Sequence, residues 1–345
     1  MNWNLIGHDW AVRLLRGHVE KDQIRHAYLF AGPPGVGKRT LALKFLQALA
    51  CVDPPQAGDF CGVCRACKLI ENTAHPDLYI VTTEESDRSL KVDQIRDLRA
   101  KLSLSPYEAE RRMALLIDFH QATEQAANAL LKTLEEPPPE VVLLLTAFSS
   151  ESLLPTIVSR CEVITLRSLP TSTLTKELIE RGEEEKRAQL LAGIAGGRPG
   201  WALRIARDPS LLERRASLID EMMELIGNGR IDRFAYVEDW SESLRRKFGS
   251  PEDRRKECLD VLDTWIGFWR DVMLTAFGVD EPVSNVDHKS EITMLSKGIQ
   301  EDRIVNALQA LQDTANAIDR NANIRLALET LMIDLPHLDF QSIKS

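Results

Sequence analysis

The residues GPPGVGK, at positions 32–38, have the types and spacing of a phosphate-binding loop. Glycines in such a loop let backbone N–H groups point at phosphate oxygens, and Lys38 adds positive charge near the outer phosphates. The next residue is Arg39, where the pattern requires a Ser or Thr hydroxyl that binds magnesium. A guanidinium there removes a magnesium contact and adds repulsion. The sequence therefore predicts a loop that could hold ATP, while hydrolysis of ATP is doubtful.

Two neighbouring positions bear on the same chemistry. Asp118 ends a predicted strand and fits the second carboxylate that organises magnesium, although it could equally cap a turn. An ATPase usually follows this Asp with a Glu that polarises water, but here Phe119 follows. Thr40 offers a hydroxyl, yet one helical position rotates it by about a quarter of a circle away from the loop. The candidate nucleotide-binding residues are Gly32, Pro33, Pro34, Gly35, Val36, Gly37, Lys38, Arg39, Thr40, Asp118 and Thr146.

Four of the six cysteines, Cys51, Cys61, Cys64 and Cys67, lie in one short stretch. Four thiolates can complete a tetrahedral zinc shell and leave no open position for catalysis. In a reducing compartment such a cluster favours metal over disulfides. The sequence predicts a structural zinc module at 51–67, with buried cysteines that bind nothing as the alternative. His75 could compete as a ligand, but we expect it to serve the turn before Pro76.

Composition limits the class of protein. A chain of 345 residues is long enough for two or three domains. Its formal charge of -9 gives no overall attraction to nucleic acid, so any contact with DNA must be local or shared with other chains. The N-terminus lacks an apolar signal core, and no segment offers the roughly 20 apolar residues that cross a bilayer. We expect a cytoplasmic protein without a membrane partner.

The order of apolar runs indicates an α/β fold at the N-terminal end. Runs at 27–31, 113–117 and 141–147 have the length of buried strands, and helix-like stretches at 40–51 and 92–102 separate them. This alternation predicts a parallel sheet with helices on both faces. The phosphate loop would then lie at the carboxyl end of a strand, where ligands of open α/β sheets bind.

Strand signals fade beyond Leu166, and a segment of short predicted helices is punctuated by Gly196-Gly197 and Pro199-Gly200. From about Leu211 the apolar spacing suits packed helices. The expected domains are a nucleotide-binding-type domain at 1–167, a small helical lid at 168–208, and an all-helical domain at 209–345.

Several motifs together resemble the bacterial clamp-loader subunits of DNA polymerase III, members of the AAA+ family. They are GPPGVGK, CGVCRAC, HPD at 75–77, NALLKTLEEPP at 128–138, Ser159-Arg160-Cys161, and NANIRLALETLMIDL near the C-terminus. The resemblance covers nearly the whole chain. Within the family the chain is similar to the delta-prime branch, because gamma or tau ATPase subunits carry Thr or Ser at the position of Arg39 and Glu at that of Phe119.

The resemblance implies an AAA+ domain, a lid and an all-helical collar. It also implies partners: gamma or tau and delta subunits in a hetero-pentameric ring, with the sliding clamp and primer-template DNA bound through the complex. Such a subunit would help ATP-driven loading of the clamp during DNA replication. The isolated chain would have no intrinsic activity, and DNA-directed DNA polymerase activity would belong to the holoenzyme.

Individual residues also take roles from the resemblance. Arg160 would be an arginine finger that acts in trans on ATP bound by a neighbouring subunit, although a lone arginine is usually solvated or ion-paired. Thr146 matches a polar sensor of the terminal phosphate, or merely ends a strand. Gly200 aligns with a phosphate-sensing arginine of active members, and Arg198 lies two residues earlier.

Three functions compete at this point. The first is a non-hydrolysing subunit that lends Arg160 to a partner. The second is an ATP-hydrolysing motor subunit of the same complex, in which Thr40 would rescue magnesium binding. The third is a phosphate-loop kinase, which needs a basic acceptor pocket. Arg111 and Arg112 are the candidates for that pocket, but we expect them to form a solvated edge before a strand.

Overall fold

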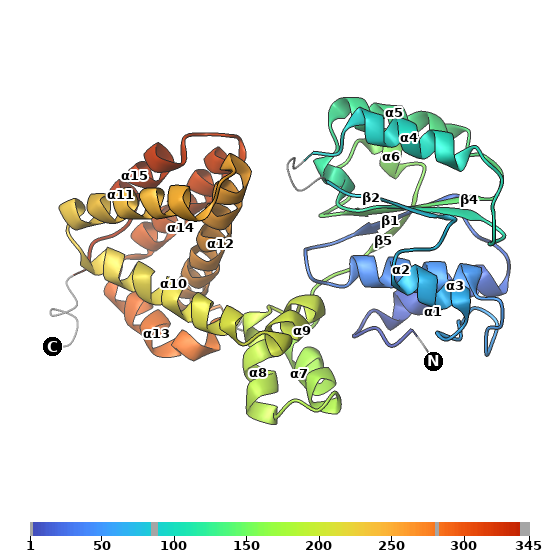
Figure 1. Cartoon of the computed structure of the whole chain (residues 1–345). Coiled ribbons are helices and arrows are strands. Elements are labelled where there is room, and N and C mark those ends of the chain that lie inside the picture. The colour runs from blue at the N-terminus through green and yellow to red at the C-terminus, as the bar shows by residue number, and fades with distance from the viewer. Residues whose placement is uncertain (1–2, 84–88, 280–282, 339–345) are drawn as a thin grey trace. The chain divides into compact units, whose positions relative to one another are not determined.

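The computed structural model describes residues 3–83, 89–279 and 283–338. The chain divides into two compact units, the first formed by Met1–Glu177 with Gly197–Trp201 and the second by Leu178–Gly196 with Ala202–Ser345. Each unit has core residues of its own; the first combines a parallel sheet with helices, and the second is helical (Figure 1).

The first unit contains a five-stranded parallel sheet in the order β2-β3-β4-β1-β5. Every residue of the central strands β1, β3 and β4 is buried, as expected for a sheet covered on both faces. The register places Phe30 of β1 opposite Thr146 of β4. The strands are β1 (Ala27–Ala31), β2 (Leu78–Val81), β3 (Arg112–Leu116), β4 (Val141–Ala147) and β5 (Glu162–Thr165).

Helices cover both faces of the sheet (Figure 1). One face is covered by α1 (Asp9–Glu20), α2 (Lys38–Ala50) and α3 (Arg65–Glu71), and the other by α4 (Val92–Leu102), α5 (Glu124–Glu135) and α6 (Pro155–Val158). Alternate strand residues enter the two cores, with Phe30 in one and Leu29 in the other. The predicted α/β fold, a parallel sheet with helices on both faces, is confirmed.

The segment predicted as a lid contains three short helices, α7 (Thr171–Glu180), α8 (Glu185–Ile194) and α9 (Pro199–Arg207). The boundary between the compact units passes through α7 and α9. The domain limits at 167 and 208 therefore stay predictions.

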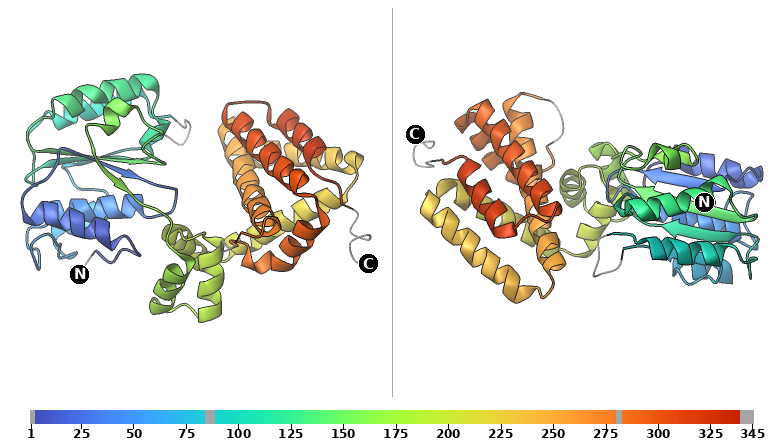
Figure 2. Two further views of the ribbon diagram at one scale, coloured as in Figure 1. Left: turned by 180° about the vertical axis from the view of Figure 1, so that it is seen from behind. Right: turned by 90° about the horizontal axis from the view of Figure 1, so that it is seen from above.

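The remainder of the second unit is helical throughout its described residues, as the sequence predicted (Figure 2). Its core surrounds the long helix α12, from which Trp265, Phe268 and Trp269 are fully buried. None of the helices described for the chain is both long and apolar enough to cross a membrane. The helices are α10 (Ser210–Gly227), α11 (Arg230–Lys247), α12 (Pro251–Ala276), α13 (Lys289–Gly298), α14 (Glu301–Asp319) and α15 (Ile324–Asp334).

Candidate nucleotide and metal sites

The predicted phosphate loop connects the end of β1 to the start of α2. Its first residue, Gly32, has φ 149°, and a Cβ there would lie 2.2 Å from the carbonyl oxygen of Leu166. Gly35 and Gly37 have φ of 80° and 106°, in the left-handed region that favours glycine. The glycines are therefore required by the backbone path, and the loop leads into the N-terminus of α2 as an anion-binding loop should.

Lys38 is the first residue of α2, and only 9 % of it is exposed. Its Nζ donates hydrogen bonds to the carbonyl oxygens of Gly32 and Pro33, the latter at 3.1 Å. Burial lowers the pKa of Lys38, and the nearby carboxylate of Asp118 opposes this shift. The ammonium group is thus satisfied by its own loop, and a phosphate would have to replace these carbonyl contacts.

Asp118 and Thr146 meet beside the loop, at the carboxyl ends of β3 and β4. The backbone N–H of Asp118 donates a hydrogen bond of 2.8 Å to Oγ1 of Thr146, which is 1 % exposed. The hydroxyl of Thr146 therefore holds the turn after β3. Arg39 and Thr40, in contrast, are exposed. The structure brings Lys38, Asp118 and Thr146 together at the carboxyl ends of the central strands.

His120 belongs to the same cluster, and sequence reasoning missed it. Burial lowers its pKa, while the charges of Asp118 and Lys38 act on it in opposite directions. Its Nδ1 is buried without a hydrogen-bond partner. The only sequence signal was its place two residues after Asp118. Phe119, at the position where an ATPase carries Glu, is 1 % exposed and packs in the core between the sheet and α5.

The first turn of α9 lies directly against the phosphate loop. The N–H of Gly200 donates a hydrogen bond of 2.7 Å to the carbonyl oxygen of Gly35. A Cβ at Gly200 would approach that oxygen to 2.9 Å, so a side chain does not fit without movement of the backbone. The resemblance aligns position 200 with a phosphate-sensing arginine. In this chain the backbone of Gly200 instead packs closely against the backbone of Gly35.

The four clustered cysteines are brought together by the end of α2 and the start of α3. Their sulfur atoms all lie within 4.8 Å of one another, and none forms a disulfide. Tetrahedral zinc with Zn–S bonds of about 2.3 Å requires sulfurs that are about 3.8 Å apart, so a small contraction would complete the shell. The cluster could bind a metal such as zinc.

Backbone hydrogen bonds orient the thiols. The N–H of Cys61 donates to Sγ of Cys51 and that of Cys64 to Sγ of Cys61, each at 3.2 Å. The N–H groups of Cys64 and Val63 lower the pKa of Cys61 to about 6, whereas burial raises the pKa of Cys67. The thiolate is the form that binds metal. These shifts favour the thiolate form of Cys61 and the protonated form of Cys67 when no metal is bound.

His75 lies outside this cluster and serves its own turn. Its Nδ1 accepts a hydrogen bond of 3.1 Å from the N–H of Asp77. The Asp77 carboxylate in turn accepts from the N–H groups of Tyr107, Glu108 and Ala109, at 2.7, 2.7 and 2.9 Å. Burial acts to raise the pKa of Asp77, but these donors lower it. Through Asp77, the motif HPD thus holds the loop at 107–109, which precedes β3, by hydrogen bonds.

Arg160 follows α6 and lies at the surface, with 34 % of its side chain exposed. Its Nη2 donates to Oε1 of Glu135 at 2.9 Å, and its Nη1 donates to the carbonyl oxygen of Thr156 at 2.9 Å. The guanidinium is therefore held on a surface from which a partner chain could contact it.

The expectation of a solvated edge at Arg111 and Arg112 is wrong for Arg112. This residue is 6 % exposed, and its guanidinium donates to the carbonyl oxygen of Ser105 and to the hydroxyl of Tyr79. Arg111 forms a surface ion pair with Asp22 at 3.1 Å. Both arginines therefore already have partners within the chain. Neither is available to form the basic acceptor pocket that the kinase alternative requires.

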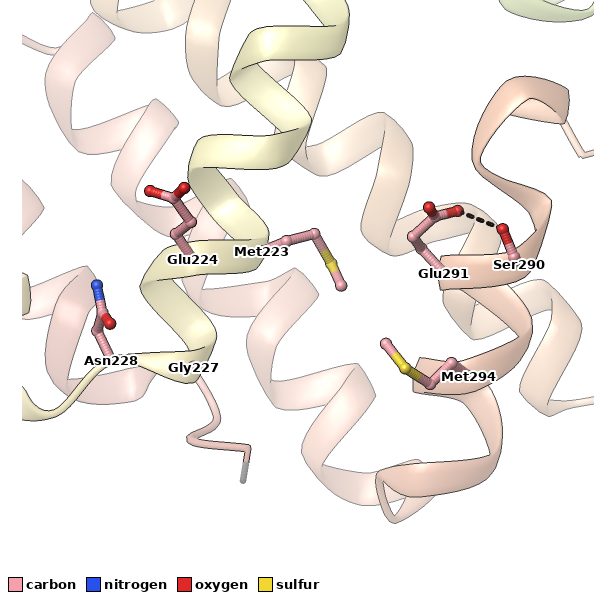
Figure 3. A pocket seen from close by; sticks show the side chains of 7 residues that line it. All are labelled: Met223, Glu224, Gly227, Asn228, Ser290, Glu291 and Met294. Carbon is pink, nitrogen blue, oxygen red and sulfur yellow. Dashed lines mark hydrogen bonds between the residues drawn. The ribbon is translucent and has the colours of Figure 1, made fainter. Parts of the chain in front are cut away.

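A pocket of about 640 Å³ lies in the second unit, between the end of α10 and α13. Figure 3 shows the side chains of Met223 and Met294 pointing toward one another across it. Its charged lining residues are Glu224 and Glu291. Carboxylates repel phosphate, so this pocket is unsuited to a nucleotide, and none of the predicted site residues lines it.

The comparisons with known proteins agree with this geometry. A family model described as DNA polymerase III, delta subunit, matches residues 7–170. DNA polymerase III subunit delta' of Bacillus subtilis is 28 % identical over 325 residues, covering 94 % of each chain. The subunit delta' of Pseudomonas aeruginosa is 36 % identical, over 64 % of this chain and 66 % of the relative. That of Haemophilus influenzae is 31 % identical, over 64 % of this chain and 71 % of the relative.

The chain belongs to the delta-prime family of DNA polymerase III subunits. The delta-prime resemblance predicted from the sequence is thereby confirmed. The family model ends at residue 170, while the Bacillus relative extends the similarity into the helical second unit.

Proposed function

We propose that the chain is a non-hydrolysing subunit of the clamp loader of DNA polymerase III. It would join gamma or tau and delta subunits in a hetero-pentameric ring that loads the sliding clamp onto primed DNA at the expense of ATP. The observation that carries the proposal is a well-formed phosphate loop surrounded by positions unfit for catalysis. ATP binding at this loop would require Lys38 to leave the carbonyl oxygens of Gly32 and Pro33.

Three positions support the loss of hydrolysis. Arg39 offers a cation where magnesium needs an oxygen ligand. Phe119 is buried in the core and has no group that could activate water. Gly200 has no side chain to sense a phosphate, and its backbone is bound to Gly35. The competing motor function needs Thr40 to bind magnesium, but Thr40 is exposed on α2 beyond the loop.

Arg160 would supply the chain's contribution to catalysis. A guanidinium that reaches a neighbour's triphosphate stabilises the charge that develops on the transferring phosphoryl group. The surface position of Arg160 and its place after α6 support this role. It would act on nucleotide bound by a neighbouring motor subunit, not on nucleotide bound at positions 32–38.

The cysteine cluster would hold a structural zinc ion. The ligands would be Cys51, Cys61, Cys64 and Cys67, which leave no coordination position for substrate. The ion would tie the end of α2 to the start of α3, where Cys64 caps the helix. The all-helical second unit would provide the main contacts between subunits.

The test is ATP turnover by the isolated chain and by the reconstituted complex with its cognate subunits. The isolated chain should not turn over ATP. Arg160→Ala should leave assembly intact and remove the turnover of the site that Arg160 faces, because an arginine finger contributes about a thousandfold or more. Appreciable turnover by the isolated chain that disappears in Lys38→Ala would instead favour the motor function. A complex with Arg160→Ala that matches the wild type would end the arginine-finger assignment.

A further inference from the structure

The ion pair between Arg160 and Glu135 links two of the motifs named above, Ser159-Arg160-Cys161 and NALLKTLEEPP at 128–138. Nη2 of Arg160 contacts Oε1 of Glu135 at 2.9 Å. Nη1 donates to the carbonyl oxygen of Thr156 at 2.9 Å and to Oγ of Ser159 at 3.4 Å. The guanidinium is therefore held by two side chains and one carbonyl of its own subunit.

Glu135 is fixed more firmly than a surface loop residue would be. It is the last residue of α5, whose neighbouring residues Thr133 and Leu134 are 5 % and 2 % exposed. Glu136 caps the helix, and three prolines follow it. The backbone that carries Glu135 is therefore anchored by packing, while its carboxylate, in a side chain that is 51 % exposed, is held through its contact with Arg160.

The place of Glu135 is also unfavourable for the helix itself. The carboxyl end of a helix carries partial negative charge, so a carboxylate in its last turn is repelled. The positive charge of Arg160 offsets this repulsion, as does that of Lys132 in the same turn.

We propose that Glu135 is a positioning residue that acts on a neighbour's ATP through Arg160. This inference rests on the proposed role of Arg160 as an arginine finger. A free arginine side chain samples many rotamers and loses that freedom on binding a phosphate. The contact with Glu135 restricts those rotamers before the partner arrives. An exposed ion pair changes an equilibrium by roughly fivefold or less, which suits orientation and is too little to hold the fold.

The experiment compares Glu135→Gln with Arg160→Ala in the reconstituted complex. The quantity is the Arg160-dependent part of ATP turnover, which is the wild-type rate minus the Arg160→Ala rate. We expect Glu135→Gln to lower kcat for this part by roughly two- to fivefold, the range of an exposed ion pair. KM for ATP and the thermal unfolding midpoint of the isolated chain should change little. Glu135→Asp, which keeps the charge, should retain more activity than Glu135→Gln.

The control is Glu136→Gln, which removes the next charge along the chain and should behave as the wild type. Glu135→Gln should have no further effect when Arg160 is already alanine, because the carboxylate acts through the guanidinium. Wild-type or faster turnover by Glu135→Gln, with Arg160→Ala impaired, would overturn this inference and leave the arginine finger standing. Wild-type turnover by Arg160→Ala would overturn both.

Discussion

The backbone N–H of Gly200 donates a hydrogen bond of 2.7 Å to the carbonyl oxygen of Gly35, so that α9 begins against the phosphate loop. The two residues are far apart in the sequence, and the contact depends on the absence of a side chain at Gly200. The phosphate loop is therefore held by a backbone hydrogen bond from Gly200, the position that the resemblance aligns with a phosphate-sensing arginine.

Gly200→Ala should destabilise the first unit by about 1–3 kcal/mol, because the new Cβ overpacks against the oxygen of Gly35. The measurement is the free energy of unfolding in urea. Gly17→Ala is the matched control, since Gly17 lies within α1 and a Cβ there would meet nothing within 4 Å. It should stabilise the protein by about 0.5–1 kcal/mol. A Gly200→Ala variant that is as stable as the wild type, or more stable, would contradict the close contact between Gly200 and Gly35.

The cysteine cluster should contain about one equivalent of zinc per chain when the protein is purified without a chelator. Cys64→Ser should lower the zinc content and the thermal unfolding midpoint, because Cys64 is both a proposed ligand and the cap of α3. Cys161→Ser, outside the cluster, should keep the metal. Metal-free protein with wild-type stability would remove the zinc proposal.

Arg233 should be essential for the stability of the second unit. It is 2 % exposed and donates hydrogen bonds to the carbonyl oxygens of five residues at the ends of α10 and α15, which are Leu225, Ile226, Met332, Leu335 and Pro336. Arg233→Met leaves these acceptors unpaired and should cost about 3 kcal/mol or more of unfolding free energy.

Two variants separate the effect of these hydrogen bonds of Arg233 from the effect of its charge alone. Arg233→Lys keeps the charge but not the planar fork of donors, so it should recover only a minor part of the loss. Arg230→Met removes an exposed arginine from the same helix and should change stability by about 0.5 kcal/mol or less. A mild effect of Arg233→Met in urea unfolding would show that water can replace the guanidinium.

Acidification should destabilise the first unit through His75. Burial holds the pKa of His75 below its ordinary value of 6.5, so the unfolded chain takes up a proton first as the pH falls. The stability that neutral His75 contributes is complete above about pH 6.5 and is lost as the pH drops through the folded pKa. Protonation of Nδ1 would also break the hydrogen bond from Asp77.

The measurement is the unfolding free energy between pH 7.5 and 5.5. His75→Asn keeps a hydrogen-bond acceptor and removes the titrating group, so its stability should fall less steeply with pH than that of the wild type. An identical pH dependence in the variant would mean that other groups, such as buried His8, account for the loss.

The sequence predicted the central strands better than the edges. The predicted strands at 27–31 and 141–147 and the helix at 92–102 have these bounds in the structure. Uninterrupted apolar runs make central strands visible. The strands β2 and β5 lie at the two edges of the sheet, and each is only four residues long. In β5 the polar residues Glu162 and Thr165 interrupt the apolar pattern as well.

The candidate sites could be predicted only where their residues lie close together in the sequence. The glycine spacing reveals the loop, and the cysteine spacing reveals the cluster. The contact of Gly200 with Gly35 and the ion pair of Arg160 with Glu135 are long-range, and no local pattern encodes them. Arg112 was expected in solvent because its hydroxyl and carbonyl partners belong to separate segments.

The burial of Phe119 limits what a single substitution at this position could achieve. The aromatic ring belongs to a packed core, so a carboxylate introduced at that position would lose its hydration and would not fill the space of the ring. Phe119→Glu alone would therefore bury an acid in the core between the sheet and α5, and we expect it to destabilise the first unit without creating a group that activates water.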